Sequence, residues 1–194
     1  MGDFSNSHGY LSKMSQESLL VLNGIMADPV VNLNAGWNLF PVMATCNLAA
    51  NEVFGQIPGL IIAYEVAGNG IYYPELSIFS LQEVAPGKAY WVKMAAAASF
   101  TFPICGKEDK FEKTFPIRTP NTTPWNHVAY TGTSHIVIFD HNATQQFSKG
   151  DLIGAFTGSG ICAGLTSFDG NLISLSLFGD DFSTPYQDGF YPDE

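Results

Sequence analysis

The stretch LLVLNGIMADPVVNLNAGWNLFPVM, residues 19–43, indicates the kind of fold that this chain adopts. Its apolar residues stand in short runs that alternate with polar residues, and the pairs Asn-Gly, Asp-Pro and Ala-Gly separate these runs. Such pairs favour turns, and runs of this length favour strands of about five residues. The stretch therefore predicts a fold built from short β-strands.

The same pattern continues as far as Pro103. The segments LIIAYEV, GIYYPEL and KAYWVKM are typical of strands, and AAAASFTFP is expected to close the set. The segment VAPGK predicts a type II turn with Pro86 and Gly87 at its centre. We expect Trp37 and Trp91, which occupy strand positions, to lie in the core.

One segment of the first half favours a helix. In CNLAANEVFGQIPG, Asn47 is suited to cap the N-terminus and Gly55 to end the helix. In the second half, HVAYTG, SHIVIFD, DLIGAFT, GICAGLTSF and NLISLSLFG indicate strands without a helical period. Gly150 and Asp151 predict a tight turn in which the carboxylate accepts backbone N–H groups.

Together these segments predict an all-β chain with two small β-sandwich or barrel-like modules and one short helix in the first. The segment CGKEDKFEKTFPIRTPNTTPW is rich in Lys and Glu and then in Pro and Thr, as exposed connectors are. The predicted organisation is a flexible N-terminal segment (1–18), a first module (19–105), a connector (106–120) and a second module (121–194).

The charge of the chain excludes one class of partner. The formal net charge is −10, and from Asn121 onward Lys149 is the single basic residue against eight carboxylates. Such a surface repels phosphate backbones, so nucleic acid is not expected as a partner. The apolar runs are strand-sized, so membrane insertion is not expected either. The first residues lack the features of a signal peptide, and we expect a native export signal to lie outside this sequence.

The three cysteines, Cys46, Cys105 and Cys162, lack the spacing of a metal site. Cys162 stands in an apolar run and is expected to pack as a small hydrophobic residue. The sequence leaves open whether Cys46 and Cys105 form a disulfide, because nothing in it fixes their geometry.

Several motifs in this order resemble a known pair of modules. The segments LNAGWNLFPV, CNLAANEVFGQI, VAGNGIYYPE and LQEVAPGKAYWVKM resemble a module that recurs in large secreted and cell-surface proteins of Bacteroidetes. The segments KGDLIGAF, GICAG and FGDDFSTPYQDGF resemble its companion module. The resemblance implies export by type IX secretion and an extracellular or cell-surface location. It implies no active-site residues.

The acidic end of the chain, FGDDFSTPYQDGFYPDE, is the candidate ion site. Pro185 and Gly189 bend the chain there and favour the convergence of Asp180, Asp181 and Asp188. Clustered carboxylates repel one another unless a cation such as calcium, solvent or hydrogen bonds relieve them, and the spacing is not that of an EF-hand. The alternative is an Asx turn that involves Ser183 and Thr184.

Aromatic residues beside turns are the candidate ligand site. Tyr72, Tyr73 and Trp125 stand next to Gly or Pro and could form a platform on which sugar rings stack. The alternative is that they cover local packing.

No catalytic residues are predicted. The four histidines, His8, His127, His135 and His141, do not form a metal-binding motif, and no nucleophile stands at a recognisable spacing from a base. We expect a non-catalytic extracellular surface module for adhesion, glycan binding or domain spacing, with a glycan or a surface protein as partner. One alternative is an accessory region of a secreted polysaccharide-degrading or protein-degrading enzyme. Another is a metal-dependent enzyme that uses the acidic end.

Overall fold

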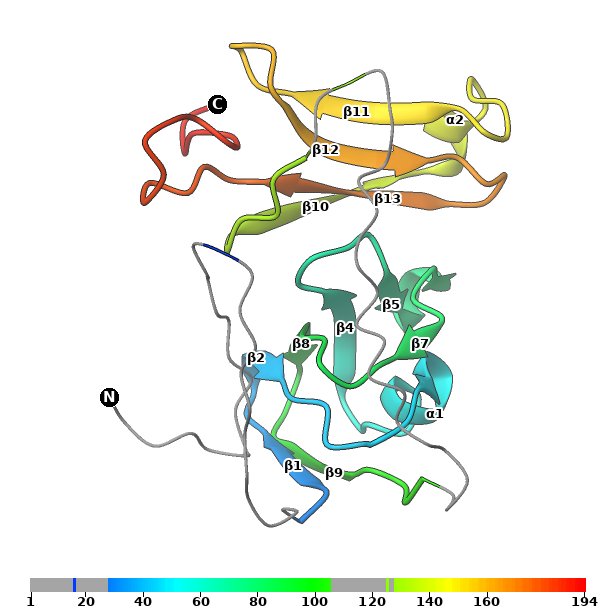
Figure 1. The fold of residues 1–194 in the computed structure, drawn as a ribbon. Coiled ribbons are helices and arrows are strands. Elements are labelled where there is room, and N and C mark those ends of the chain that lie inside the picture. Colours follow the sequence, from blue (N-terminus) through cyan, green and yellow to red (C-terminus); the bar gives the residue numbers. More distant parts are fainter. Residues whose placement is uncertain (1–15, 17–27, 106–124, 126–127) are drawn as a thin grey trace. The chain divides into compact units, whose positions relative to one another are not determined.

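The computed structural model describes Gln16, residues 28–105, Trp125 and residues 128–194 (Figure 1). Most of its elements are short strands paired in antiparallel ladders, and its helices are short. This confirms the predicted all-β class.

The described chain divides into two compact units. The first holds residues 28–65, 72–77 and 81–105, and the second holds Val66–Ile71, Ile78–Ser80, Trp125 and 128–194. The predicted connector and the ends of the modules beside it fall largely in residues 106–124, which lie outside the described residues. The module boundaries therefore stay predictions.

A five-stranded sheet has the order β2-β8-β4-β5-β6, and most of its residues belong to the first unit, whereas β6 and Ile71 of β5 are grouped with the second. Its strands are β2 (Gly36–Phe40), β8 (Tyr90–Met94), β4 (Leu60–Glu65), β5 (Ile71–Tyr73) and β6 (Ile78–Phe79). Two further antiparallel pairs are β1 (Val30–Leu33) with β9 (Ala98–Thr101) and β3 (Leu48–Ala49) with β7 (Glu83–Val84). The helices are α1 (Ala50–Phe54) and the 3₁₀ turn η1 (Pro74–Leu76).

The core of the first unit lies against one face of this sheet. Alternate residues of β8, namely Tyr90, Val92 and Met94, are buried there, because successive side chains of a strand point to opposite faces. The Phe40 ring lies 5.5 Å from the ring of Phe54 in α1, measured between centroids. The Asn47 prediction was wrong: its amide donates to Glu83 Oε2 at 3.2 Å, and Ala49 precedes the helix without a side-chain cap.

The reason for this difference is that residues 48–49 pair with β7 as strand β3, so the chain turns into the helix later than predicted. Gly55 ends α1 as predicted. The type II turn is also confirmed, because Gly87 has φ of 78° and the N–H of Lys88 donates to the carbonyl of Ala85 at 3.3 Å.

A disulfide joins Cys46 to Cys105, with the two Cα atoms 5.9 Å apart. Cys46 follows β2 and Cys105 follows β9, and the side chain of Cys105 packs against the core. The structure thus resolves the alternative that the sequence left open.

The second unit contains two antiparallel strand pairs. Strand β10 (Ser134–Phe139) pairs with β13 (Ile173–Phe178), and β11 (Leu152–Phe156) pairs with β12 (Cys162–Ser167). Within this unit, Asn69 donates to Leu165 O at 2.8 Å and its side-chain oxygen accepts from Ser176 N at 2.9 Å. These bonds satisfy polar groups beside the buried Ser176 side chain.

Two details of the second unit differ from the prediction. A short helix, α2 (His141–Thr144), follows β10, and the carboxylate of Asp140 caps it by accepting from Ala143 N at 2.8 Å. The segment HVAYTG was expected to be a strand, but residues 128–132 form none, and Val128 is instead buried against Cys162 and Phe178. The burial of Cys162 is as predicted.

The turn at Gly150 and Asp151 forms as predicted. Gly150 has φ of 98°, a conformation that favours glycine, and Asp151 Oδ2 accepts from the backbone N–H of Ser148 at 2.7 Å. The turn leads directly into β11.

Candidate functional site

The five-stranded sheet has a second face, opposite the core, that carries aromatic side chains. The register of the strands places Trp37 opposite Lys93, and Trp91 opposite both Leu39 and Tyr64. Partners in register point to the same side of a sheet. We call Trp37, Tyr64, Trp91 and Lys93 the aromatic face.

Tyr64 and Lys93 hold the Trp37 ring of the aromatic face. Trp37 is 51% exposed, and its ring meets the Tyr64 ring edge-on, with centroids 5.8 Å apart and an interplanar angle of 81°. The ammonium of Lys93 lies 5.5 Å from the centroid of the Trp37 ring, within the range of a cation–π interaction. Partial burial raises the pKa of the Tyr64 phenol. The indole of Trp37 is therefore exposed to solvent in a defined orientation.

The prediction that Trp37 and Trp91 lie in the core was wrong. Residues 90, 92 and 94 of β8 point inward, so Trp91 and Lys93 point outward, and both are half-buried. A signal for this was present in the sequence, because Lys93 stands two residues after Trp91 and a charged side chain marks the solvent side of a strand.

The three aromatic residues predicted as a platform are placed differently from one another. Tyr72 is 5% exposed, its hydroxyl donates to Asn51 Oδ1 at 2.9 Å, and its ring packs on Phe54, so it belongs to the core. Tyr73 is half-buried at the end of β5. Trp125 belongs to the second unit, where its ring meets the Phe156 ring edge-on at 5.3 Å. Because Tyr72 is buried, it cannot present its ring to a sugar.

The structure brings Asp180, Asp181 and Asp188 together in one loop. Asp180 Oδ1 accepts from the N–H of Asp188, and Asp188 Oδ1 accepts from the N–H of Asp181, both at 2.8 Å. Asp181 Oδ1 accepts from both the N–H and the hydroxyl of Ser183, at 2.9 and 2.7 Å, which is the geometry of an Asx turn. All three carboxylates thus accept backbone N–H groups. Within the described ranges, no group of His, Cys, Asp and Glu side chains is arranged to hold a metal, and calcium binding stays a prediction.

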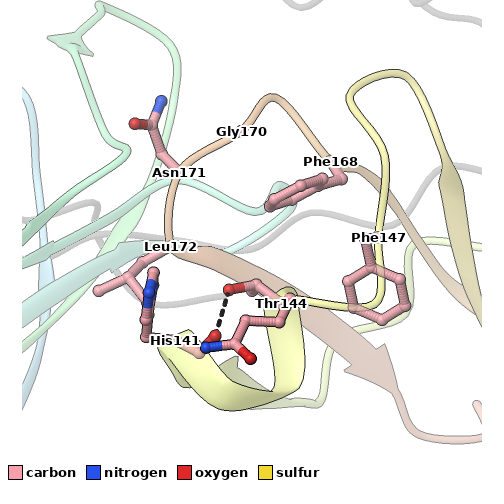
Figure 2. Close-up of a pocket in the computed structure, with 8 residues that line it drawn as sticks. His141, Thr144, Phe147, Phe168, Gly170, Asn171 and Leu172 are labelled. Atoms are coloured by element: carbon pink, nitrogen blue, oxygen red, sulfur yellow. Dashed lines mark hydrogen bonds between the residues drawn. The ribbon is translucent and has the colours of Figure 1, made fainter.

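A pocket of about 380 Å³ lies in the second unit (Figure 2). We call it the α2 pocket, and it is lined by His141, Thr144, Gln145, Phe147, Phe168, Gly170, Asn171 and Leu172. Sequence reasoning missed it, because α2 was not predicted. Of the histidines, His135 is exposed on β10 and His141 lies at this pocket, while His8 and His127 lie outside the described residues.

Cys162 is not placed to act as a nucleophile. Its side chain is buried, and burial raises the pKa of the thiol. The thiol donates to Gly164 O at 3.3 Å. A thiol held in its neutral form is a poor nucleophile, because the thiolate is the reactive species.

Comparisons with known proteins found no match for this chain among protein families, curated proteins or solved structures. In the part of the chain that the structure describes, no helix has the length and apolar character needed to cross a bilayer.

Proposed function

We propose that this chain is a non-catalytic module of an exported protein, and that it binds glycans at the aromatic face of its first unit. The observation that carries the proposal is the half-exposed indole of Trp37, held in place by Tyr64 and Lys93. The resemblance to surface modules of Bacteroidetes, with export by type IX secretion, is part of the same proposal.

The chemistry of sugars suits such a surface. A pyranose ring has a face of C–H groups and a rim of hydroxyls, so its face packs on an aromatic ring while its rim stays hydrated. An indole offers a large rigid surface with an apolar body, and it loses little conformational freedom on binding. Trp37 and Trp91 stand on neighbouring strands of one sheet face. Two indoles on one face favour an extended saccharide chain over a single compact ligand.

The disulfide between Cys46 and Cys105 supports the extracellular part of the proposal. Disulfides persist in secreted and cell-surface proteins, whereas the cytosol of most organisms keeps thiols reduced. An extracellular location would also give the module access to polysaccharides and surface glycans. Adhesion and the spacing of neighbouring domains are roles that the same module would serve.

A glycan array followed by calorimetry with soluble xyloglucan, xylan, mannan and pectin tests the proposal. We expect Trp37→Ala to weaken binding of the best polysaccharide at least ten-fold, while the unfolding midpoint changes little because the indole is half-exposed. Phe182→Ala is the matched control, since it removes another exposed ring from the second unit. The proposal fails if no glycan binds, or if neither Trp37→Ala nor Trp91→Ala weakens binding.

A further inference from the structure

The α2 pocket has two walls that local hydrogen bonds hold in place (Figure 2). On the α2 wall, Asp140 caps the helix and the hydroxyl of Thr144 donates to His141 O at 3.0 Å, the dashed bond in Figure 2. On the opposite wall, Asp169 Oδ1 accepts from Asn171 N at 2.9 Å, and Gly170 has φ of 102°. Both walls are therefore ordered without a ligand, as most small-molecule sites are.

The floor of the pocket is aromatic. The rings of Phe147 and Phe168 lie 5.9 Å apart between centroids at an angle of 60°. Phe139 supports Phe147 from strand β10, with its ring centroid 6.1 Å away. Phe168 is buried, whereas Phe147 is half-buried, so the ring that offers surface to the cavity is that of Phe147.

Polar side chains stand at the rim. His141 and Gln145 are exposed at the α2 wall, and between them they offer both donors and acceptors. The amide of Asn171 points away from α2 in Figure 2, and the Thr144 hydroxyl already donates to His141. His141 and Gln145 are therefore the side chains that we expect to form hydrogen bonds with a ligand.

The side chains that line the pocket favour an uncharged ligand. None of the eight lining residues has a carboxylate, ammonium or guanidinium group. Asp140 and Asp169 adjoin the lining residues, and the hydrogen bond from the backbone of Asn171 lowers the pKa of Asp169. Lys149 acts on Asp169 as an opposite charge, so the charges beside the pocket partly offset each other, and the lining side chains offer no carboxylate, ammonium or guanidinium partner to an ion of either sign.

We propose that the α2 pocket binds one residue of a neutral saccharide, with the ring face against Phe147, which Phe168 supports from below the surface, and the hydroxyls bonded to His141 and Gln145. A volume of about 380 Å³ lies near the lower end of the range for ligand pockets, which suits a single sugar ring. The pocket shares no residue with the aromatic face, so it is a separate site in the other unit. The inference does not rest on the proposed function of that face.

Titration of the full chain with methyl glycosides of glucose, galactose, mannose and N-acetylglucosamine, followed by amide NMR, tests this proposal. We expect one of these neutral probes to shift the resonances of the α2 pocket, with a weaker response to glucuronate and glucosamine. Gln145→Ala should weaken the binding about five-fold, the equivalent of one hydrogen bond. Gln146→Ala is the matched control, because Gln146 is the next residue and does not line the pocket.

Binding at the aromatic face and binding at the α2 pocket can be tested independently of each other. Trp37→Ala should leave the monosaccharide shifts at the α2 pocket unchanged, even if it abolishes polysaccharide binding. The proposal is overturned if none of the four probes shifts pocket resonances, if a charged sugar binds more tightly, or if both His141→Ala and Gln145→Ala bind as the parent does. Both side chains are exposed, so their removal should leave the fold intact.

Discussion

Removal of the Cys46–Cys105 disulfide should destabilise the first unit by about 4 kcal/mol. The two residues are 59 positions apart, so the bond closes a loop of that length in the unfolded chain. The chain-entropy relation gives about 3 kcal/mol for a 15-residue loop and about 4.7 kcal/mol for a 100-residue loop, and this loop falls between them. Since domains are stable by only about 5–15 kcal/mol, the loss would be a large fraction of the total.

The double variant Cys46→Ser/Cys105→Ser tests this value by urea unfolding. The chain has three tryptophans, and a Trp125→Phe background leaves Trp37 and Trp91, both in the first unit, as fluorescence reporters. With an unfolding slope of about 2 kcal/mol per molar urea, the midpoint should fall by roughly 2 M.

Chemical reduction of the disulfide in the parent chain is the control for the serine substitutions. A thiol reductant should lower the midpoint of the parent but leave that of the double variant unchanged. The reasoning is refuted if parent and double variant unfold at the same urea concentration. It is also refuted if the denatured, unreduced parent shows three reactive thiols, because the structure leaves only Cys162 free.

Three other predictions concern pH, calcium and domain organisation. Burial raises the pKa of Tyr90 from 10.0 to about 12, although the hydrogen bond from the backbone of Ala85 acts in the opposite direction. The unfolded phenol ionises first, so the stability of the first unit should be fully present below pH 10 and fall as pH rises to about 12, and Tyr90→Phe should flatten that fall in pH-dependent urea titrations. Millimolar calcium should raise the melting temperature of the full chain, and a chelator should reverse the rise. If calcium leaves the melting temperature unchanged while Asp181→Ala lowers it, the carboxylates serve only as hydrogen-bond acceptors within the turn. Limited proteolysis should cut between Lys107 and Arg118 and leave two folded fragments, whereas a chain that resists cleavage there would speak against two separate cores.

The local features of this fold follow from the sequence. The strands predicted at LIIAYEV, KAYWVKM and DLIGAFT all form, because apolar runs bounded by turn residues leave few other conformations. The type II turn at Gly87 and the tight turn at Gly150 form because a positive φ there suits glycine. These features depend on residues close together in the chain.

The features that were missed depend on residues far apart in the chain. In KAYWVKM, Lys93 marks the outward side of the strand, but only pairing with β2 and β4 brings Trp37, Tyr64 and Trp91 to one face. Asn47 would cap a helix in isolation, but its segment pairs with β7 instead. The disulfide joins residues whose approach is set by the fold as a whole. The α2 pocket likewise depends on a four-residue helix, too short to give a clear period.

The separation of the two faces of the sheet has a consequence for how such a module can diversify. In β8 the inward residues Tyr90, Val92 and Met94 are buried, while Trp91 and Lys93 point to the other side of the sheet and are half-buried. Substitutions at the outward positions can therefore accumulate without opening cavities in the core. Related chains could carry the same scaffold with different outward side chains, and each could recognise a different surface at little loss of stability.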